Sequence, residues 1–136
     1  MYKRQAYAPL GRGLITGRYK SLDDFEEDDN RRLWPRFQPE NFSKNIELVK
    51  VFENLAIQKN CTPAQVCLAW IMAQGPDIIP IPGTKTIKYL EQNLGAVDVE
   101  ILEEENQYVR KLTSEAGGAI GSRDLDSYSF ADTAPL

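Results

Sequence analysis

The stretch that decides the fold is Ile78-Ile79-Pro80-Ile81-Pro82, an apolar run without polar residues. A strand of this kind is typical of a parallel sheet, whose strands are covered on both faces. Gly83-Thr84-Lys85-Thr86 follows, and Ile87, Leu90 and Leu94 then recur at helical spacing. The stretch therefore predicts a buried strand, a turn and a short amphipathic helix.

A second strand is expected near the start of the chain, where Ala6-Tyr7-Ala8-Pro9-Leu10 runs into the glycine turn Gly11-Arg12-Gly13. Two amphipathic helices are expected between the strands. The first begins near Asn41 or Ser43 and ends at about Lys59.

The second of these helices has a clear start signal. Thr62 is its expected N-cap, Pro63 lies in its first turn and Gln65 completes a capping box, and Gly75-Pro76 ends it. The positions expected to be buried are Ile46, Val49, Phe52, Leu55 and Ala56 in the first helix and Val66, Ala69, Trp70 and Ala73 in the second.

Two regions complete the chain. A last helix is expected from about Glu100 to Glu115 with Leu102, Val109 and Leu112 facing inward, and residues 119–136 look irregular. Residues 16–41 lack apolar periodicity and contain a block of acidic side chains, which predicts a long surface loop with a solvated acidic face.

The order of these elements predicts the fold class. Strands that alternate with helices imply right-handed crossovers and a parallel sheet, so the fold class is α/β. Two strands do not form a sheet that stands alone, so the pattern is that of an α/β protein from which most strands are missing.

The composition excludes several classes of site. The 136 residues correspond to one domain, and the net charge of −4 argues against nucleic acid or an anionic membrane as a partner. The sequence contains no histidine, which excludes Ser-His-Asp and Cys-His arrangements and His-ligated metal sites within this chain.

Cys61 and Cys67 fit neither a metal knuckle nor a redox pair, so we expect reduced thiols, no metal and a cytoplasmic protein. The first residues predict no signal peptide, and no apolar run approaches the roughly 18 residues of a membrane span.

Two loops contain residues suited to an anion. Gly83-Thr84-Lys85 places a hydroxyl and an ammonium group where a strand enters a helix, which is the chemistry that a phosphate requires. The alternative is a capping threonine beside an exposed lysine. Gly11-x-Gly13-x-x-x-Gly17 is only loosely similar to a dinucleotide glycine loop, because its last gap is one residue too long, and a plain glycine turn is its alternative.

Several segments resemble the aldo-keto reductase family. They are Tyr7-Ala8-Pro9-Leu10-Gly11-Arg12-Gly13, residues 35–42, residues 62–70, Ile81-Pro82-Gly83-Thr84-Lys85 with residues 89–96, and residues 130–136. The similarity covers nearly the whole chain in the family's order and spacing. It is greatest to the fungal and plant branch that includes pyridoxal reductases and auxin-induced-type reductases.

The resemblance implies a (β/α)8 TIM barrel, of which this chain would form the C-terminal part: strands 7 and 8 with their helices and the C-terminal tail. It also implies NADPH or NADP⁺ as the cofactor and a small-molecule carbonyl substrate that is reduced to an alcohol by hydride transfer. By matching position, the implied cofactor-binding residues are Ala8, Pro9, Leu10, Gly11 and Arg12 on the pyrophosphate and nicotinamide side, Thr84 and Lys85, next to Gly83, at the 2′-phosphate, and Gln92 and Asn93 at the adenine.

The sequence departs from the family in three ways. Ala8 stands where the family commonly has serine, and Gln92 where many members have glutamate. The family's catalytic tetrad of Asp, Tyr, Lys and His comes from earlier strands, so the resemblance places no catalytic residue in this chain. We therefore expect residues 1–136 to be a partial NADP-dependent oxidoreductase domain that is unstable and inactive alone.

Three alternatives stay open at this stage. The chain is a fragment of an aldehyde and ketone reductase, a non-catalytic truncated paralogue or nucleotide-binding subunit that associates with other barrel chains, or a product that does not fold. Residues 16–41 are predicted to be mobile, because they lack periodicity and contain a block of like charges. Their place directly after the proposed pyrophosphate strand suggests a flap that orders over the bound cofactor, and the alternative is a permanently disordered surface loop.

Overall fold

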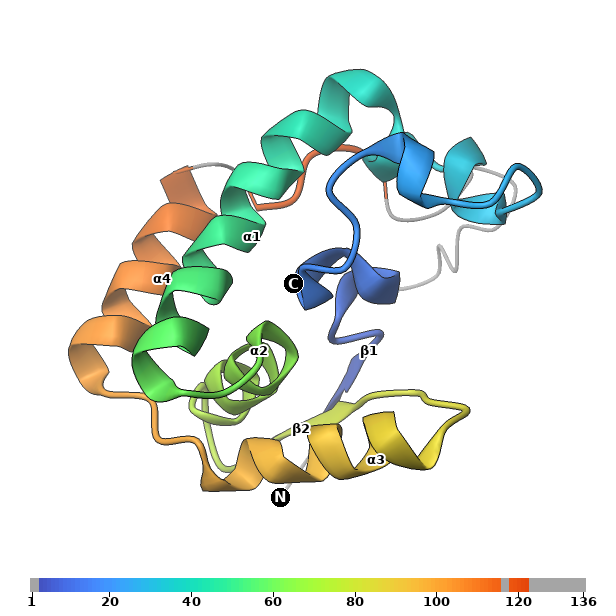
Figure 1. The fold of residues 1–136 in the computed structure, drawn as a ribbon. Coiled ribbons are helices and arrows are strands. Elements are labelled where there is room, and N and C mark those ends of the chain that lie inside the picture. The colour runs from blue at the N-terminus through green and yellow to red at the C-terminus, as the bar shows by residue number, and fades with distance from the viewer. Residues whose placement is uncertain (1–2, 116–117, 123–136) are drawn as a thin grey trace.

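The computed structural model describes residues 3–115 and 118–122, in which strands and helices alternate (Figure 1). The regular elements are β1 (Arg4–Tyr7), α1 (Pro39–Lys59), α2 (Pro63–Met72), β2 (Ile78–Ile81), α3 (Ile87–Leu94) and α4 (Glu103–Glu115). The connections contain the 3₁₀ helices η1 (Gly11–Thr16), η2 (Leu22–Asp24), η3 (Asn30–Leu33), η4 (Pro35–Phe37) and η5 (Gly95–Asp98). Within these described ranges, no helix combines the length and the apolar character needed to cross a membrane.

The strands β1 and β2 pair in parallel, as the apolar run predicted, with Tyr7 aligned to Ile81. β1 begins earlier than the predicted strand, at Arg4. It also ends earlier, at Tyr7, because Ala8 has a φ of 47° and so leaves the extended conformation. The prediction that β2 is covered on both faces is wrong for this chain, since Ile79 and Ile81 are 38% and 39% exposed. The described residues are a helix-rich α/β fragment whose two-stranded sheet is open on both sides.

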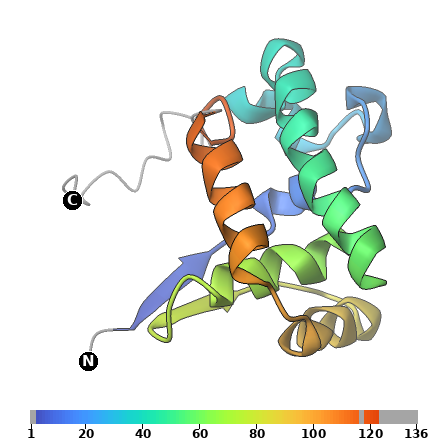
Figure 2. The ribbon, with the colours of Figure 1, turned by 90° about the vertical axis from the view of Figure 1, so that its left-hand side faces the viewer.

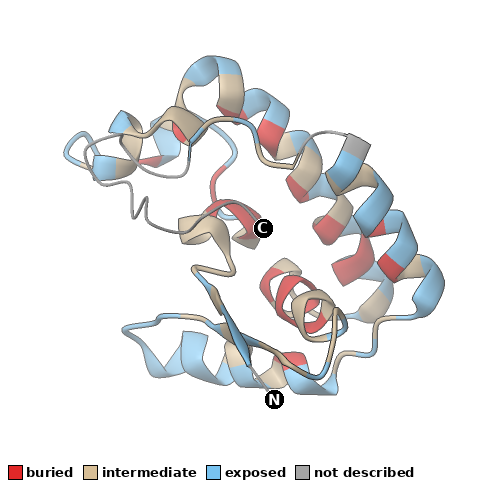
Figure 3. Ribbon diagram, turned by 180° about the vertical axis from the view of Figure 1, so that it is seen from behind, coloured by how far each residue is buried: buried red, intermediate tan, exposed pale blue. Residues whose placement is uncertain are grey.

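The helices α1 and α2 pack against each other and turn their buried residues inward (Figure 3). α1 begins at Pro39, after Gln38 as N-cap, and not at the predicted Asn41 or Ser43. Proline suits this position because its fixed φ is helical and its missing N–H has no partner in a first turn. α2 begins as predicted, since Gln65 N donates to Thr62 Oγ1 at 3.3 Å and Thr62 N donates to Gln65 Oε1 at 2.9 Å.

The burial of these two helices agrees with most of the predicted pattern. The predicted positions that are buried are Val49, Phe52, Leu55, Ala56, Val66 and Ala69. Ile46 and Trp70 are half-buried, and Ala73 is exposed because α2 ends at Met72.

Residues 16–41 are packed more closely than the sequence indicated. Tyr19, Phe25 and Phe37 are buried, and the Tyr19 and Phe25 rings stack with their centroids 4.3 Å apart. Acidic side chains around these rings, such as Asp23 and Glu27, are exposed. The solvated acidic face is confirmed. The buried aromatic residues were not predicted, because aromatic residues at uneven spacing give no periodic signal. A movement of this segment over a cofactor stays a prediction.

The last two helices differ in how much of their apolar surface is covered. α3 lies along β2 (Figure 1), and its predicted inward positions Ile87 and Leu94 are 75% and 61% exposed. α4 runs beside α1 (Figures 1 and 2) and buries Val109, while Lys59 of α1 forms an ion pair with Glu105 of α4 at 2.8 Å. α4 starts three residues later than predicted, and Leu102 is exposed.

A buried amide holds residues 118–122 against α1. Asn45 is 1% exposed, and its Nδ2 donates to the carbonyls of Arg36 and Ile120, each at 2.9 Å. Its Oδ1 accepts from the Ile120 amide at 2.7 Å. Arg36 N in turn donates to Ser122 O at 3.2 Å. This part of the tail is irregular, as predicted, but fixed, and residues 130–136 lie outside the described residues.

Replacing Asn45 by alanine should release this part of the tail. The Ile120 amide loses its acceptor, so we expect its hydrogen exchange to become at least about tenfold faster, the equivalent of one lost buried hydrogen bond. Exchange measured by mass spectrometry over residues 118–122 checks this. Asn54→Ala on the exposed side of the same helix is the control and should change nothing; equal exchange in both variants would contradict the role of Asn45.

The 136-residue chain, produced alone, should self-associate. It exposes the apolar residues of α3 and both edges of its sheet, and surfaces of these kinds favour association. Sedimentation velocity should show oligomers, and Leu94→Lys should shift the distribution toward monomer. A monomeric unaltered chain with a sharp thermal transition would contradict this prediction.

Candidate functional site

Both predicted anion loops leave the sheet at the same edge. Tyr7 and Ile81 are aligned partners and the last residues of β1 and β2, so Ala8 and Pro82 begin their loops side by side. Ligands of α/β proteins bind in the loops beyond the carboxyl ends of parallel strands. The pairing therefore brings together two segments that are more than 70 residues apart in the sequence.

The first loop is a tight turn with several left-handed residues. Ala8, Gly11 and Arg12 have φ values of 47°, 57° and 57°, and Gly13 has a φ of 95°. Gly11 N donates to Ala8 O at 2.9 Å, which closes the turn. Two of these four residues are not glycine, so surrounding contacts must stabilise a conformation that such residues seldom adopt.

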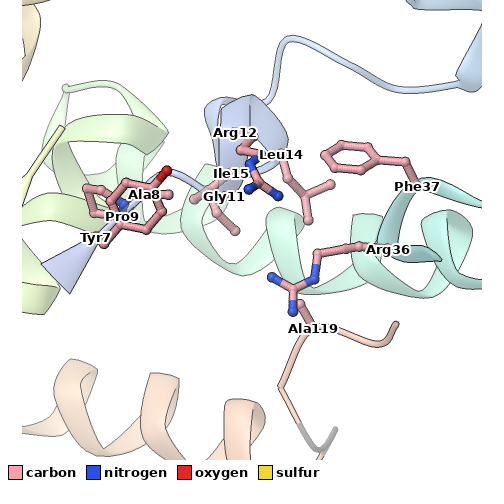
Figure 4. A pocket seen from close by; sticks show the side chains of 10 residues that line it. All are labelled: Tyr7, Ala8, Pro9, Gly11, Arg12, Leu14, Ile15, Arg36, Phe37 and Ala119. Carbon is pink, nitrogen blue, oxygen red and sulfur yellow. The ribbon is translucent and has the colours of Figure 1, made fainter. Parts of the chain in front are cut away.

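A pocket of about 200 Å³ opens beside this turn (Figure 4). Its lining combines apolar groups and two guanidinium groups, and consists of Tyr7, Ala8, Pro9, Gly11, Arg12, Leu14, Ile15, Arg36, Phe37 and Ala119. The Arg12 guanidinium also lies 3.8 Å from the centre of the Trp34 ring. Guanidinium groups bind phosphate and carboxylate oxygens, so the pocket suits a ligand with an anionic part and an apolar part.

The second loop presents its polar groups to solvent. Gly83, Thr84 and Lys85 are all exposed. Thr84 Oγ1 accepts from Thr86 N at 3.2 Å, and Thr86 is the N-cap of α3, since its Oγ1 accepts from Tyr89 N at 3.3 Å. Thr84 and Lys85 thus lie just before the helix start, with Thr84 bonded within the turn and Lys85 beside it.

The predicted adenine residues are placed differently from each other. Gln92 Nε2 donates to Thr62 Oγ1 at 2.7 Å, so this side chain ties α3 to the start of α2. Asn93 is half-buried. The structure thus gives Gln92 an internal partner that spacing did not indicate, and its contact with an adenine stays a prediction.

Sequence reasoning missed three residues of the site. Arg36 and Ala119 line the pocket, and Trp34 lies under the Arg12 guanidinium. Arg36 Nε and Nη2 both donate to Gly121 O at 3.3 Å, which joins the pocket wall to the tail segment. Residues 35–42 were noted for their resemblance to the family, but nothing in their spacing indicated a place in a pocket.

A buried thiol supports the first loop from behind. Cys67 Sγ in α2 donates to Pro9 O at 3.4 Å. Burial raises the pKa of Cys67 to about 12, so the group is a neutral donor at neutral pH. Burial also raises the pKa of Cys61, but that side chain is half-buried.

Comparisons with known proteins agree with one another. A family model described as "Aldo/keto reductase family" matches residues 4–114. The chain is 51% identical over 133 residues to "Aldo-keto reductase yakc [NADP(+)]" of Schizosaccharomyces pombe, a match that covers 96% of this chain and 39% of that protein. It is 55% identical over 111 residues to "Aldo-keto reductase str7" of Strobilurus tenacellus, covering 82% of this chain and 33% of the relative. "Probable aldo-keto reductase 1" of Glycine max is 37% identical over 134 residues, covering 95% and 38%. The chain thus spans between a third and two fifths of the length of these curated relatives.

The two cysteines should differ in their reactivity toward thiol reagents. At pH 8 a thiol with a pKa of about 12 is ionised in about one molecule in ten thousand, and the thiolate is the reactive form. A Cys61→Ser variant should therefore react much more slowly with 5,5′-dithiobis(2-nitrobenzoic acid) than a Cys67→Ser variant. The rate of the Cys61→Ser variant should rise as the pH is raised. Equal rates at pH 8 would show that α2 does not hold Cys67 against the first loop.

Proposed function

Because the chain belongs to the aldo/keto reductase family, we propose that residues 1–136 form strands 7 and 8 of its (β/α)8 barrel with their helices and the C-terminal tail, and carry the NADP(H) site. The observation that supports this assignment most strongly is the parallel pairing of Tyr7 with Ile81. It aligns two loops that follow consecutive strands, and phosphate sites of such barrels often lie after strands 7 and 8.

The residues of the first loop suit the diphosphate and nicotinamide side of the cofactor. Arg12 supplies a guanidinium group for a phosphate oxygen, and Ala8 to Gly11 form the tight turn beside the pocket. Leu14 and Ile15 add an apolar wall, which suits a nicotinamide ring.

The residues of the second loop suit the adenosine side. Lys85 is an exposed ammonium group and Thr84 a hydroxyl, and both lie beside Gly83 just before the first turn of α3. A 2′-phosphate would find a point charge and a hydrogen-bonding hydroxyl there. Asn93 and, after release from Thr62, Gln92 would contact the adenine.

Bound NADPH would supply the hydride that reduces a small carbonyl substrate to an alcohol. The role of this chain is to bind the cofactor and to orient it so that the nicotinamide ring lies at the pocket. We assign no proton donor to the chain, because its sequence contains no histidine. The segments that resemble non-catalytic parts of the family include Tyr7, Tyr19, Tyr89, Tyr108 and Tyr128. The tyrosine that protonates the carbonyl oxygen belongs, in this proposal, to the remainder of the barrel.

A second candidate function follows from the open sheet edges and the exposed apolar face of α3. In this function the chain is a nucleotide-binding subunit that associates with other barrel chains through these surfaces. A cytoplasmic location with reduced thiols, Cys61 and Cys67, suits either function.

A chimera tests the first candidate against the second. The matching stretch of the Schizosaccharomyces pombe relative is replaced by this chain, and NADPH oxidation is followed with a reactive aldehyde. The first candidate predicts turnover by the chimera and none by the 136-residue chain alone. A folded chimera that binds NADPH but does not turn over would favour the nucleotide-binding subunit.

Lys85→Ala in the chimera should change the preference between the two nicotinamide cofactors. A charge-assisted contact with a phosphate is worth on the order of 1.5–3 kcal/mol, so the KM for NADPH should rise roughly ten- to a hundredfold while the KM for NADH stays nearly unchanged. Lys50→Ala, which removes an exposed lysine paired with Glu47 on α1, should change neither value. Equal losses with both cofactors would remove the 2′-phosphate role from Lys85.

A further inference from the structure

Arg31 is held rigidly between a carboxylate and two aromatic rings. Its Nε donates to Asp29 Oδ1 at 2.9 Å and to Oδ2 at 3.1 Å, and its Nη2 donates to Oδ2 at 2.5 Å. The guanidinium lies 4.5 Å from the centre of the Tyr19 ring and 4.7 Å from that of Phe25. The Arg31 side chain is 22% exposed, and its hydrogen bonds lower the pKa of Asp29. This fork–carboxylate geometry fixes the direction of the remaining donors.

One of the remaining donors of Arg31 reaches the first loop. Nη1 donates to the carbonyl oxygen of Arg12 at 3.0 Å, and Nη2 donates to the hydroxyl of Tyr19 at 2.9 Å. The approach is close, because a Cβ added at Gly13 would lie 3.2 Å from Arg31 Nη1. The carbonyl that accepts this bond joins Arg12 and Gly13, both of which have a positive φ.

The bond from Arg31 therefore acts at one of the two non-glycine residues of the loop that have a positive φ. Arg12 is a non-glycine residue in the left-handed region, and such a residue keeps that conformation only where contacts over-determine it. A charged donor on its carbonyl is a contact of this kind. The Arg12 side chain lines the pocket, so the backbone geometry at Arg12 also decides where its guanidinium lies.

We infer that Arg31 is a positioning residue for the cofactor: it fixes the left-handed turn at Arg12 and so places the Arg12 guanidinium for the diphosphate and nicotinamide half of the dinucleotide. This inference rests on the proposed function. Arg31 acts through Arg12 and does not itself contact the ligand. Loss of Arg31 should therefore weaken the binding of the nicotinamide half of the cofactor. It should hardly change the binding of the adenosine half, which lies at the second loop.

Arg32 offers a matched control. It is the next residue of the same 3₁₀ helix, and its Nη2 and Nε donate to the carbonyls of Phe25 and Glu26 at 2.7 and 2.9 Å. These bonds hold the same segment together, with acceptors outside the first loop. Arg31→Lys and Arg32→Lys each keep the charge and remove the planar fork.

The experiment is equilibrium dialysis of the chimera described above, in which this chain is part of a complete barrel. The probes are NADP⁺ and adenosine 2′,5′-bisphosphate, which lacks the nicotinamide half. For Arg31→Lys we expect about tenfold weaker binding of NADP⁺ and less than a twofold change for the bisphosphate. Arg32→Lys should change neither. Asp29→Asn removes the charge that holds the Arg31 guanidinium but leaves Arg31 in place. This variant should also bind NADP⁺ more weakly.

The possible results separate the inference from the function on which it rests. Unchanged NADP⁺ binding by Arg31→Lys overturns the inference. A similar loss for both probes, or for both arginine variants, also overturns it, because Arg31 would then support the fold in general. If a folded chimera without these substitutions binds neither probe, the proposed function fails and the inference fails with it.

Discussion

The parallel pairing of β1 with β2 is the constraint on which the rest of the structure depends. The alignment of Tyr7 with Ile81 makes two loops start at one edge of the sheet, although α1 and α2 lie between them in the sequence. A shift of this register by one residue would move the starts of the two loops apart. It would also turn the side chains of the shifted strand to the opposite face. The candidate site therefore exists because of backbone hydrogen bonds between two four-residue strands.

Around this edge, hydrogen bonds of polar side chains fix the positions of segments that hydrophobic burial alone does not define. Asn45 joins α1 to η4 and to the tail, Arg31 joins η3 to the turn at Arg12, and Cys67 joins α2 to Pro9. Each of them connects a helical element to a turn or tail segment. Such bonds are directional, so they define the shape of the pocket wall, whereas burial of α1 and α2 supplies most of the favourable free energy.

The sequence was informative where a signal is local. The capping box of Thr62 and Gln65 and the buried positions of α1 depend on neighbours three or four residues away, and the structure confirms them. The partners of Arg31, Cys67 and Asn45 lie 19, 58 and 75 residues away, and no spacing rule predicts such pairs. The apolar run of β2 predicted a covered strand, but that prediction describes a larger sheet than this chain contains. The resemblance to the family named both loops of the site, but it did not indicate that Arg36 lines the pocket.

The central claim is that the two loops form one cofactor site. Hydrogen exchange of this chain within the chimera, followed by mass spectrometry with and without NADP⁺, tests it most directly. The account predicts slower exchange in residues 8–13 and in residues 83–86 at the same NADP⁺ concentration, with no change in α4, which lies on the far side of α1 from the first loop. Protection of one loop without the other, or of neither, would contradict it.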